Sequence, residues 1–244
     1  MAGHSKWANI KHKKAKEDAK RGKVFTRLIR ELTIAARHGG SDASSNPRLR
    51  LAIAKAQAEN MTKDTMERAI KRGAGELEGA QMEEIRYEGY GPGGVAVMVD
   101  CLTDNKNRTV GEVRHAFTKA GGNLGTSGSV AFQFTERGVL FFEKVGDEDA
   151  FMEVALDAGA ADLEIDENGA EVLTAPEDYA AVYEALVAAG FTPDESEVTM
   201  RADNLSPVSA DDADKVMRLI ERLEELDDVQ SVYTNADFPE DFAG

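Results

Sequence analysis

Apolar residues in the first third of the chain recur at intervals of three and four, as in Phe25, Leu28, Ile29 and Leu32. This spacing predicts three helices, over residues 24–38, 46–59 and from 62 or 64 to 73. Gly39-Gly40 ends the first helix. Asn46-Pro47 is typical of a helix start, because asparagine caps free N–H groups and proline has none to satisfy. Residues 24–75 are therefore expected to form a small helical domain.

After residue 80 the pattern changes to short apolar runs that are bounded by turn residues. It predicts strands at residues 85–90, 95–102 and 129–134 and a helix at 107–120. Gly91-Pro-Gly-Gly94 is expected to form the hairpin turn between the first two strands.

A self-contained series of elements follows. We expect strands at residues 138–145, 162–166, 170–174 and 196–201, and helices at 147–158 and 176–189. Their order, β-α-β-β-α-β, is the ferredoxin-like arrangement. A last helix at 209–226 and a strand at 229–233 make no core alone. We therefore expect them to complete the domain that residues 81–135 begin.

The sequence thus predicts a multidomain α+β protein. An N-terminal basic helical domain precedes two α/β domains, and the ferredoxin-like one is inserted in the other. The expected limits are a basic arm at 1–23, the helical domain at 24–75, a discontinuous middle α/β domain at 76–135 and 204–244, and the inserted acidic domain at 136–203.

The charge of the chain is unevenly distributed. Over 244 residues the formal net charge is −16, yet residues 1–75 carry 18 basic and 7 acidic side chains, whereas residues 76–244 carry 11 and 38. Residues 131–200 alone hold two basic and eighteen acidic side chains. Such asymmetry indicates a nucleic-acid or membrane contact confined to the basic part. A membrane contact needs an apolar helical face, which Trp7 and Ile10 are too few to provide.

Several other classes of function lack the residues that they need. Cys101 is the only cysteine, and none of the four histidines has metal-ligand spacing to another. Glycine-rich residues 121–128 lie between a helix and the strand after it, the reverse of a phosphate-binding loop, although they could let a partner's backbone approach. No enzyme, metal or cofactor is therefore expected. Without a membrane-spanning run or a signal peptide, we expect the protein to be cytoplasmic.

The basic arm supplies the main candidate contacts for nucleic acid. Phosphate backbones bind dense cations through counterion release, and a tryptophan can stack on an exposed base. The candidates are Lys6, Trp7, Lys11, His12, Lys13, Lys14, Lys16, Lys20, Arg21, Lys23, Arg27 and Arg30. As an alternative, the arm neutralises the protein's own acidic body. A second, weaker group, which surface scatter would also explain, comprises Lys106, Arg108, Arg114 and Lys119.

Several motifs of this sequence are similar to those of the YebC/PmpR family. They include Met1-Ala-Gly-His-Ser-Lys-Trp7, Ala19-Lys-Arg-Gly-Lys-Val-Phe-Thr26, Tyr87-Glu-Gly-Tyr-Gly-Pro-Gly-Gly94 and Gly121-Gly-Asn-Leu-Gly-Thr-Ser-Gly-Ser-Val130. The resemblance runs from residue 1 to about residue 238. It implies three domains, with a ferredoxin-like domain inserted in the middle one, and a transcriptional regulator that binds DNA. Some family members resemble the mitochondrial translational activator of cytochrome c oxidase. The resemblance to these members implies a different function, in which the protein contacts the ribosome and eases protein synthesis through proline-rich stretches.

Three functions therefore compete. We favour a DNA-binding transcriptional regulator of the YebC type, although no helix-turn-helix recognition helix with base-reading side chains stands out. The alternative is a ribosome-associated translation factor that contacts ribosomal or transfer RNA, for which the same cations and Trp7 would serve. A purely structural or protein-interaction module leaves the basic arm unexplained. The expected partner is a nucleic acid, and the sequence predicts no oligomeric state.

Overall fold

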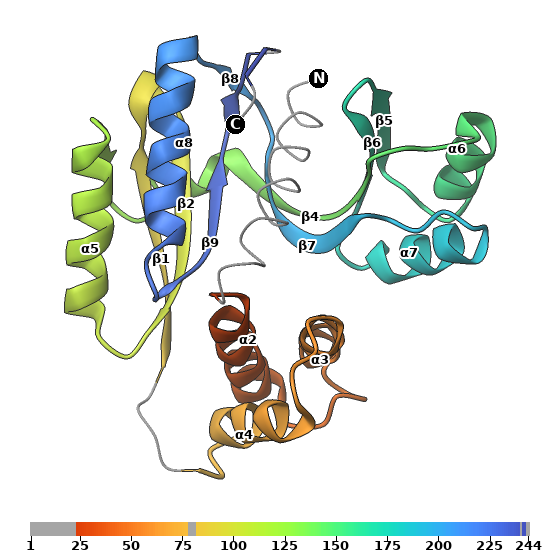
Figure 1. Ribbon diagram of the computed structural model, residues 1–244, viewed down its shortest axis with the longest axis horizontal. Helices are drawn as coiled ribbons and strands as arrows, with labels where there is room; N and C mark the ends of the chain where they lie inside the picture. The colour runs from red at the N-terminus through yellow and green to blue at the C-terminus, as the bar shows by residue number, and fades with distance from the viewer. Residues whose placement is uncertain (1–22, 78–81, 240, 243–244) are drawn as a thin grey trace.

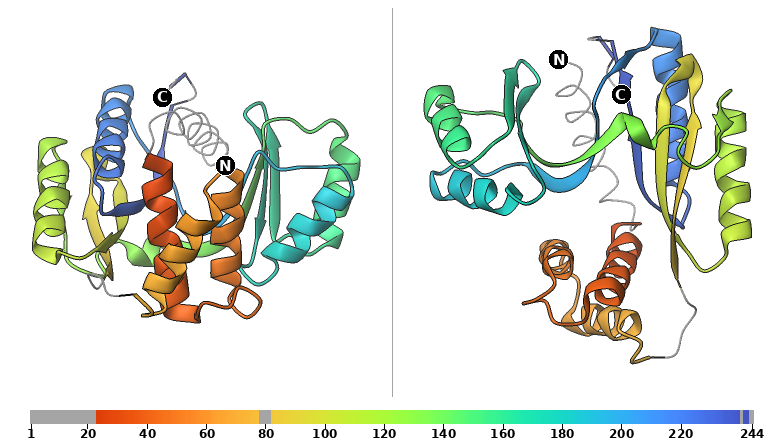
Figure 2. Two further views of the ribbon diagram at one scale, coloured as in Figure 1. Left: turned by 60° about the horizontal axis from the view of Figure 1, so that its bottom comes forward. Right: turned by 180° about the vertical axis from the view of Figure 1, so that it is seen from behind.

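The computed structural model describes residues 23–77, 82–239 and 241–242 (Figure 1). These residues form a mixed helix-and-sheet protein with seven α-helices, two four-stranded sheets and one two-stranded sheet. Three helices share one apolar core, and each four-stranded sheet packs against two of the other helices, as Figures 1 and 2 illustrate.

The helical group confirms the three helices that the apolar spacing predicts. It consists of α2 (Lys23–Gly39), α3 (Pro47–Ala58) and α4 (Lys63–Gly73). The side-chain oxygen of Asn46 accepts the N–H of Leu49 at 3.0 Å and so caps α3. Its amide nitrogen donates to the carbonyl oxygens of Ala35 and Gly40 at 2.8 Å. One asparagine thus both begins α3 and fastens it to the end of α2.

The core of this group lies between α2 and the other two helices. Its fully buried side chains are small or apolar and come from all three helices, among them Leu32, Ala35, Leu49, Ala52 and Ala69. Gly73 allows α4 to approach α2 closely, because a β-carbon at this position would lie 2.0 Å from the carbonyl oxygen of Thr33. The three helices are therefore closely packed despite their short length.

The first sheet has the strand order β3-β1-β2-β9. Its strands are β1 (Glu83–Tyr90), β2 (Ala96–Thr103), β3 (Asn123–Leu124) and β9 (Val229–Thr234), and its helices are α5 (Lys106–Lys119) and α8 (Ala210–Glu224). Val97 and Val99 of β2 pack with both helices, whereas Met98 belongs to a second apolar cluster. The pairing of β9 with β2 confirms that the C-terminal helix and strand complete this sheet.

The second sheet has the order β5-β6-β4-β7, and all its neighbouring strands are antiparallel. Its strands are β4 (Phe134–Phe142), β5 (Asp162–Asp166), β6 (Gly169–Thr174) and β7 (Glu195–Ala202), and its helices are α6 (Glu148–Asp157) and α7 (Tyr179–Ala188). Phe142 of the sheet meets Phe151 of α6 edge to face, with ring centroids 4.8 Å apart. The predicted β-α-β-β-α-β order is confirmed. We call this sheet and its two helices the acidic unit.

The prediction of a strand at residues 129–134 is wrong. Residues there form a short 3-10 helix, η3 (Ala131–Gln133), and the third strand of the first sheet is β3, which pairs with the end of β1. The backbone N–H groups of Gly128, Val130 and Ala131 instead donate to the carboxylate of Glu88. Because these donors are already occupied, the segment cannot use them in a strand ladder.

The start of the following strand also differs from the prediction. β4 begins at Phe134, whereas the pattern predicts a strand from residue 138. The predicted domain boundary between residues 135 and 136 therefore falls inside one continuous strand, and the domain limits themselves stay a prediction. A short parallel pair, β8 (Ser206–Pro207) with β10 (Ala236–Asp237), was not predicted.

In the part of the chain that the structure describes, no helix is long and apolar enough to cross a membrane.

Candidate nucleic-acid interface

Most of the predicted arm contacts lie outside the described residues. These are Lys6, Trp7, Lys11, His12, Lys13, Lys14, Lys16, Lys20 and Arg21. Lys23 is the first residue of α2. Their proposed contacts with nucleic acid therefore stay a prediction, and only Arg27 and Arg30 of this group have described side chains.

Arg27 and Arg30 both reach from α2 toward the first sheet. Nη2 of Arg27 donates to the carbonyl oxygen of Glu224, the last residue of α8, at 2.7 Å. Nη2 of Arg30 lies 3.5 Å from Oδ1 of Asp228, and the Arg30 side chain is only 17% exposed. These two arginines thus fasten the helical group to the sheet. A contact with phosphate would compete with these bonds.

Asp228 lies between α8 and β9 and is the centre of a buried polar network. Its side chain is 2% exposed. It accepts hydrogen bonds from Nη2 of Arg108 at 2.8 Å, from the Thr109 hydroxyl at 2.8 Å and from the Thr103 hydroxyl at 3.1 Å. Burial alone would raise the pKa of this carboxyl, but the bonds from Arg108, Thr109 and Thr103 lower it overall. Asp228 is therefore ionised at neutral pH and holds arginines from α2 and α5 together.

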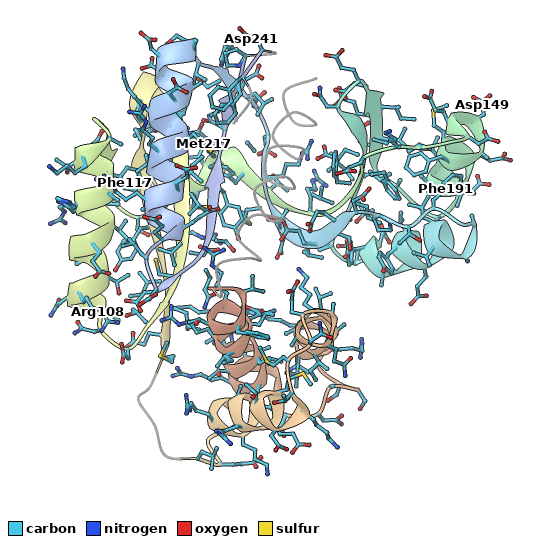
Figure 3. The ribbon with its side chains drawn as sticks, viewed as in Figure 1. Arg108, Phe117, Asp149, Phe191, Met217 and Asp241 are labelled. Atoms are coloured by element: carbon cyan, nitrogen blue, oxygen red, sulfur yellow. The ribbon has the colours of Figure 1, made fainter. Side chains whose placement is uncertain are left out.

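The second predicted group of cations does not form one cluster. Lys106 pairs with Glu83, and Arg108 pairs with Asp104 and Asp228 at the end of α5 that lies nearest the helical group (Figure 3). Lys119 ends the same helix. A rise of 1.5 Å per residue separates it from Lys106 by about 20 Å. Arg114 and Lys119 are exposed, and their side chains have no hydrogen bond or ion pair with another described residue. They stay candidates for a ligand contact.

The structure reveals a basic surface that sequence reasoning missed. We call Arg68, Lys71 and Arg72 of α4 the α4 basic face; all three are exposed and have no ion pair with another described residue. Their spacing of three and four residues places them on one side of the helix. The same spacing is present in the sequence, but the density of cations is higher in the arm, so density alone does not indicate α4.

The position of α4 in the helical group also favours a ligand contact. α3 and α4 are joined by a turn over residues 59–62, in which Asn60 has a φ of 61°. Both helices pack on α2, so the outer side of α4 faces solvent (Figure 1). Residues 24–75 hold ten basic and five acidic side chains. A polyanion would therefore meet positive charge at this end of the molecule.

The end of the glycine-rich loop over residues 121–128 is hydrogen-bonded to a carboxylate of the protein itself, that of Glu88. Glu88 of β1 is 3% exposed, and its two oxygens accept the N–H groups of Gly128, Val130 and Ala131. Burial raises the pKa of Glu88, but the three N–H donors lower it overall. The donors that could hold a phosphate thus face an internal anion.

Within the described residues, no group of three or more His, Cys, Asp or Glu side chains could hold a metal ion.

Sequence comparisons match nearly the whole chain. Residues 5–76 match the N-terminal domain of TACO1/YebC proteins, and residues 82–236 match their second and third domain. A protein of Dichelobacter nodosus, named "Probable transcriptional regulatory protein", is 80% identical over 244 residues and covers 100% of both chains. A protein of Francisella philomiragia with the same name is 64% identical over 242 residues, which are 99% of this chain and 98% of its own.

A solved structure supports the same relation. The crystal structure of a conserved hypothetical protein from Aquifex aeolicus superposes with a TM-score of 0.83 at 46% sequence identity. The match covers 93% of this chain and 94% of that one. The mixed helix-and-sheet fold described above is therefore shared with an experimentally determined structure.

Proposed function

Because this chain belongs to the TACO1/YebC family, as its motifs indicated, we propose that it is a nucleic-acid-binding regulator of gene expression. More specifically, we infer a DNA-binding transcriptional regulator. The relatives from Dichelobacter and Francisella carry the name of a transcriptional regulatory protein, which supports this assignment.

The observation that carries the proposal is the α4 basic face. Arg68, Lys71 and Arg72 are exposed on one side of a helix, and no carboxylate of the described chain neutralises them. Three unpaired cations on a rigid surface attract a polyanion, because each phosphate that they neutralise releases a condensed counterion. The predicted cations of the arm precede the same group of helices in the chain.

The proposed interface therefore combines the arm with the helical group. Lysines and arginines pair with phosphate groups, and Trp7 stacks on a base. The acidic unit is repelled by the same phosphates and lies away from the duplex. Such a division of charge orients the protein on its ligand and disfavours wrapping by non-specific nucleic acid.

The turn between α3 and α4 supports DNA over RNA. Two helices that are joined by a short turn, with exposed cations on the second, resemble the arrangement that places a helix in the major groove. The alternative, a ribosome-associated translation factor that contacts ribosomal or transfer RNA, needs cations but no such helix pair. Crosslinking in cells followed by sequencing of the bound nucleic acid distinguishes them: promoter DNA supports the regulator, and ribosomal or transfer RNA supports the alternative.

A charge-removal experiment tests the role of the α4 basic face. The triple variant R68Q/K71Q/R72Q should lower the slope of log affinity against log salt for duplex DNA by about 3, because each lost phosphate contact contributes about 0.9. The matched control is K215Q/R218Q/R222Q, which removes the same charge from exposed positions of α8. An equal change in both triples would mean that net charge alone acts, and no change in the first would exclude α4 from the interface.

A further inference from the structure

The two faces of the second sheet differ in what packs on them. Leu140 of β4 and Val172 of β6 form one apolar cluster with α6 and α7, and both helices lie on that side of the sheet (Figures 1 and 2). Because successive residues of a strand point to opposite faces, Phe141 and Glu171 lie on the other face. The strand register places Phe141 between Glu171 and Glu195 there. The helices of the acidic unit therefore leave this face to another segment.

The face opposite the helices is strongly acidic. It has two cations, Arg137 and Arg201, and Arg201 pairs with Glu171. Burial raises the pKa of Glu164, and the neighbouring carboxylates of Asp166 and Glu171 raise it as well. Like charges thus repel one another on this face, and a positively charged occupant would relieve that repulsion. We define the acidic sheet face by its carboxylates, which are Asp162, Glu164, Asp166, Glu171, Glu195 and Glu197.

Part of the acidic sheet face is covered, although α6 and α7 lie on the other side. An antiparallel sheet that is packed on one face commonly leaves the side chains of its other face in water. Phe141 and Glu171 are nevertheless each 2% exposed, and Phe141 lies outside the apolar cluster of the sheet and its helices. Beside them is a groove of about 180 Å³ that Leu173, Asp162 and Glu164 help to line. The occupant of this face must therefore bring both positive charge and apolar side chains.

We propose that residues 1–22 of the basic arm dock on the acidic sheet face of their own chain when no nucleic acid is bound. These residues hold seven Lys or Arg and two Asp or Glu side chains, so their charge complements that of the face. Trp7 and Ile10 add apolar side chains, which suit a face that combines Phe141 and Leu173 with carboxylates. One segment of the chain thus supplies both properties that the face requires.

The arm is attached at a place from which it can reach this face. Arg27, near the start of α2, donates to the carbonyl oxygen of Glu224 at 2.7 Å, so α2 begins where the helical group meets the first sheet. The acidic unit adjoins the same sheet, because Phe134 of β4 and Met98 of β2 share one apolar cluster. Even as a helix, 22 residues span about 33 Å, roughly the diameter of a small domain. A tethered segment also acts at an effective concentration in the millimolar range, which favours it over a second copy or a separate basic protein.

Docking of this kind withholds the arm from nucleic acid. The cations of the arm cannot pair with phosphate groups and with the acidic sheet face at the same time, and Trp7 cannot both stack on a base and pack on the sheet. The observed affinity is then the intrinsic affinity multiplied by the fraction of molecules whose arm is free. This competition rests on the nucleic-acid binding proposed above, whereas the docking itself does not.

The first measurement follows Trp7, the only tryptophan of the chain, in the full-length protein without nucleic acid. At about 0.05 M salt the docked arm should protect Trp7 from acrylamide quenching, and at about 1 M salt, where the screening length is about 3 Å, most of this protection should be lost. E195Q/E197Q removes two carboxylates of the acidic sheet face and should lose the protection already at low salt. The matched control is E153Q/E184Q, which removes the same charge from exposed positions of α6 and α7 and should be quenched like the wild type. The salt titration of the wild type needs no variant, so it decides the question even if a variant fails to fold.

The second measurement is the affinity of the full-length protein for duplex DNA, by fluorescence anisotropy. If the arm is free in about a tenth to a third of the molecules, E195Q/E197Q should raise this affinity about 3- to 10-fold. E153Q/E184Q should raise it less than about 2-fold, because screening weakens distant charges. Equal gains in the two double variants would mean that net charge acts rather than release of the arm, and would overturn the competition.

The outcomes separate the docking from the proposed function. Equal quenching of Trp7 at both salt concentrations, or in the wild type and E195Q/E197Q, would overturn the docking. Protection that increases with protein concentration would also overturn it, because the arm would then occupy a second copy of the chain. If Trp7 is unprotected but the wild type binds duplex DNA, the docking fails while the proposed function stands. If Trp7 is protected as expected but no nucleic acid is bound, the docking stands while the proposed function fails.

Discussion

The helical group and the acidic unit use their charged residues in opposite ways. Residues 24–75 hold ten basic and five acidic side chains, and several of the cations are exposed without a partner. Residues 131–200 hold two basic and eighteen acidic side chains. Arg201, the residue that follows this range, lies in β7 of the acidic unit and pairs with the buried Glu171 on β6 of the same sheet. The helical group should therefore attract a polyanion, whereas the acidic unit should repel it.

This difference explains why the net charge of −16 is a poor guide to the partner. Interactions between exposed charges are screened beyond about 8–10 Å at ordinary salt. A ligand that contacts the helical group therefore senses local cations more than the distant acidic unit. The distribution of charge, not its sum, decides where nucleic acid binds.

The largest expected effect comes from salt and from loss of the arm. With about 6–10 phosphate contacts, the affinity of the full chain should fall roughly 10³–10⁵-fold between 50 and 200 mM salt. Deletion of residues 1–22 should remove most of the affinity and flatten this dependence, while the thermal midpoint stays nearly unchanged. Anisotropy titrations at several salt concentrations measure both. A truncated protein that binds as tightly as the full chain would falsify the role of the arm.

The next largest effect concerns the junction between the helical group and the first sheet. D228A removes a buried carboxylate and leaves Arg30 and Arg108 without their shared partner, so it should lower the free energy of unfolding by about 3–5 kcal/mol. Urea denaturation measures the loss. The adjacent, exposed Asp227 provides the control, since D227A should change stability by less than about 0.5 kcal/mol.

The pH dependence of the Asp228 effect has a defined sign. The pKa of this carboxyl is lowered in the folded state, so its stabilising contribution is complete above the unfolded value, near 3.8, and is lost as pH falls through the lowered pKa. The stability gap between wild type and D228A should therefore stay constant from pH 6 to 8 and narrow below about pH 4. A gap that narrowed between pH 6 and 8 would mean that Asp228 is not the ionised centre of the network.

A smaller effect is expected at Glu88. E88Q removes the charge that three backbone N–H groups share, and it should cost about 1–3 kcal/mol of stability, because a charged acceptor binds each donor more strongly than an amide does. It should also increase hydrogen exchange at residues 128–131. E136Q, at an exposed position of β4, is the control. Unchanged exchange in E88Q would show that the loop holds its shape without this carboxylate.

The contrast between Glu88 and the helices shows what the sequence could predict. Helix α3 follows from local chemistry, since Asn46 and Pro47 are adjacent to the residues that they start. The β-α-β-β-α-β order follows from apolar periodicity in the same local way. The 3-10 helix at residues 131–133 was missed because its cause, Glu88, lies more than 40 residues earlier in the chain. A glycine-rich loop gives no sign of which distant carboxylate it will surround.

At the candidate site, too, contacts between residues far apart in the sequence could not be predicted. Density of lysine and arginine identified the arm and the helical group, but it could not tell exposed cations from paired ones. The charge of Arg27, Arg30 and Arg108 predicts that they contact nucleic acid, but the structure gives each of them an internal acceptor. Arg68, Lys71 and Arg72 are absent from the predicted contacts, although all three are exposed and have no ion pair with another described residue. Pairing depends on contacts between residues far apart in the sequence, such as Arg30 and Asp228.

The smallest expected effect tests whether the acidic unit takes part in binding at all. E153Q/E184Q removes two exposed carboxylates, one from α6 and one from α7. Because neither position lies in the proposed interface and screening weakens distant charges, duplex affinity should rise less than about 2-fold at 150 mM salt. Stability should change by less than about 0.5 kcal/mol. A rise of 10-fold or more would mean that the acidic unit lies close to the bound phosphates, and the division of the molecule into an attracting and a remote region would then be wrong.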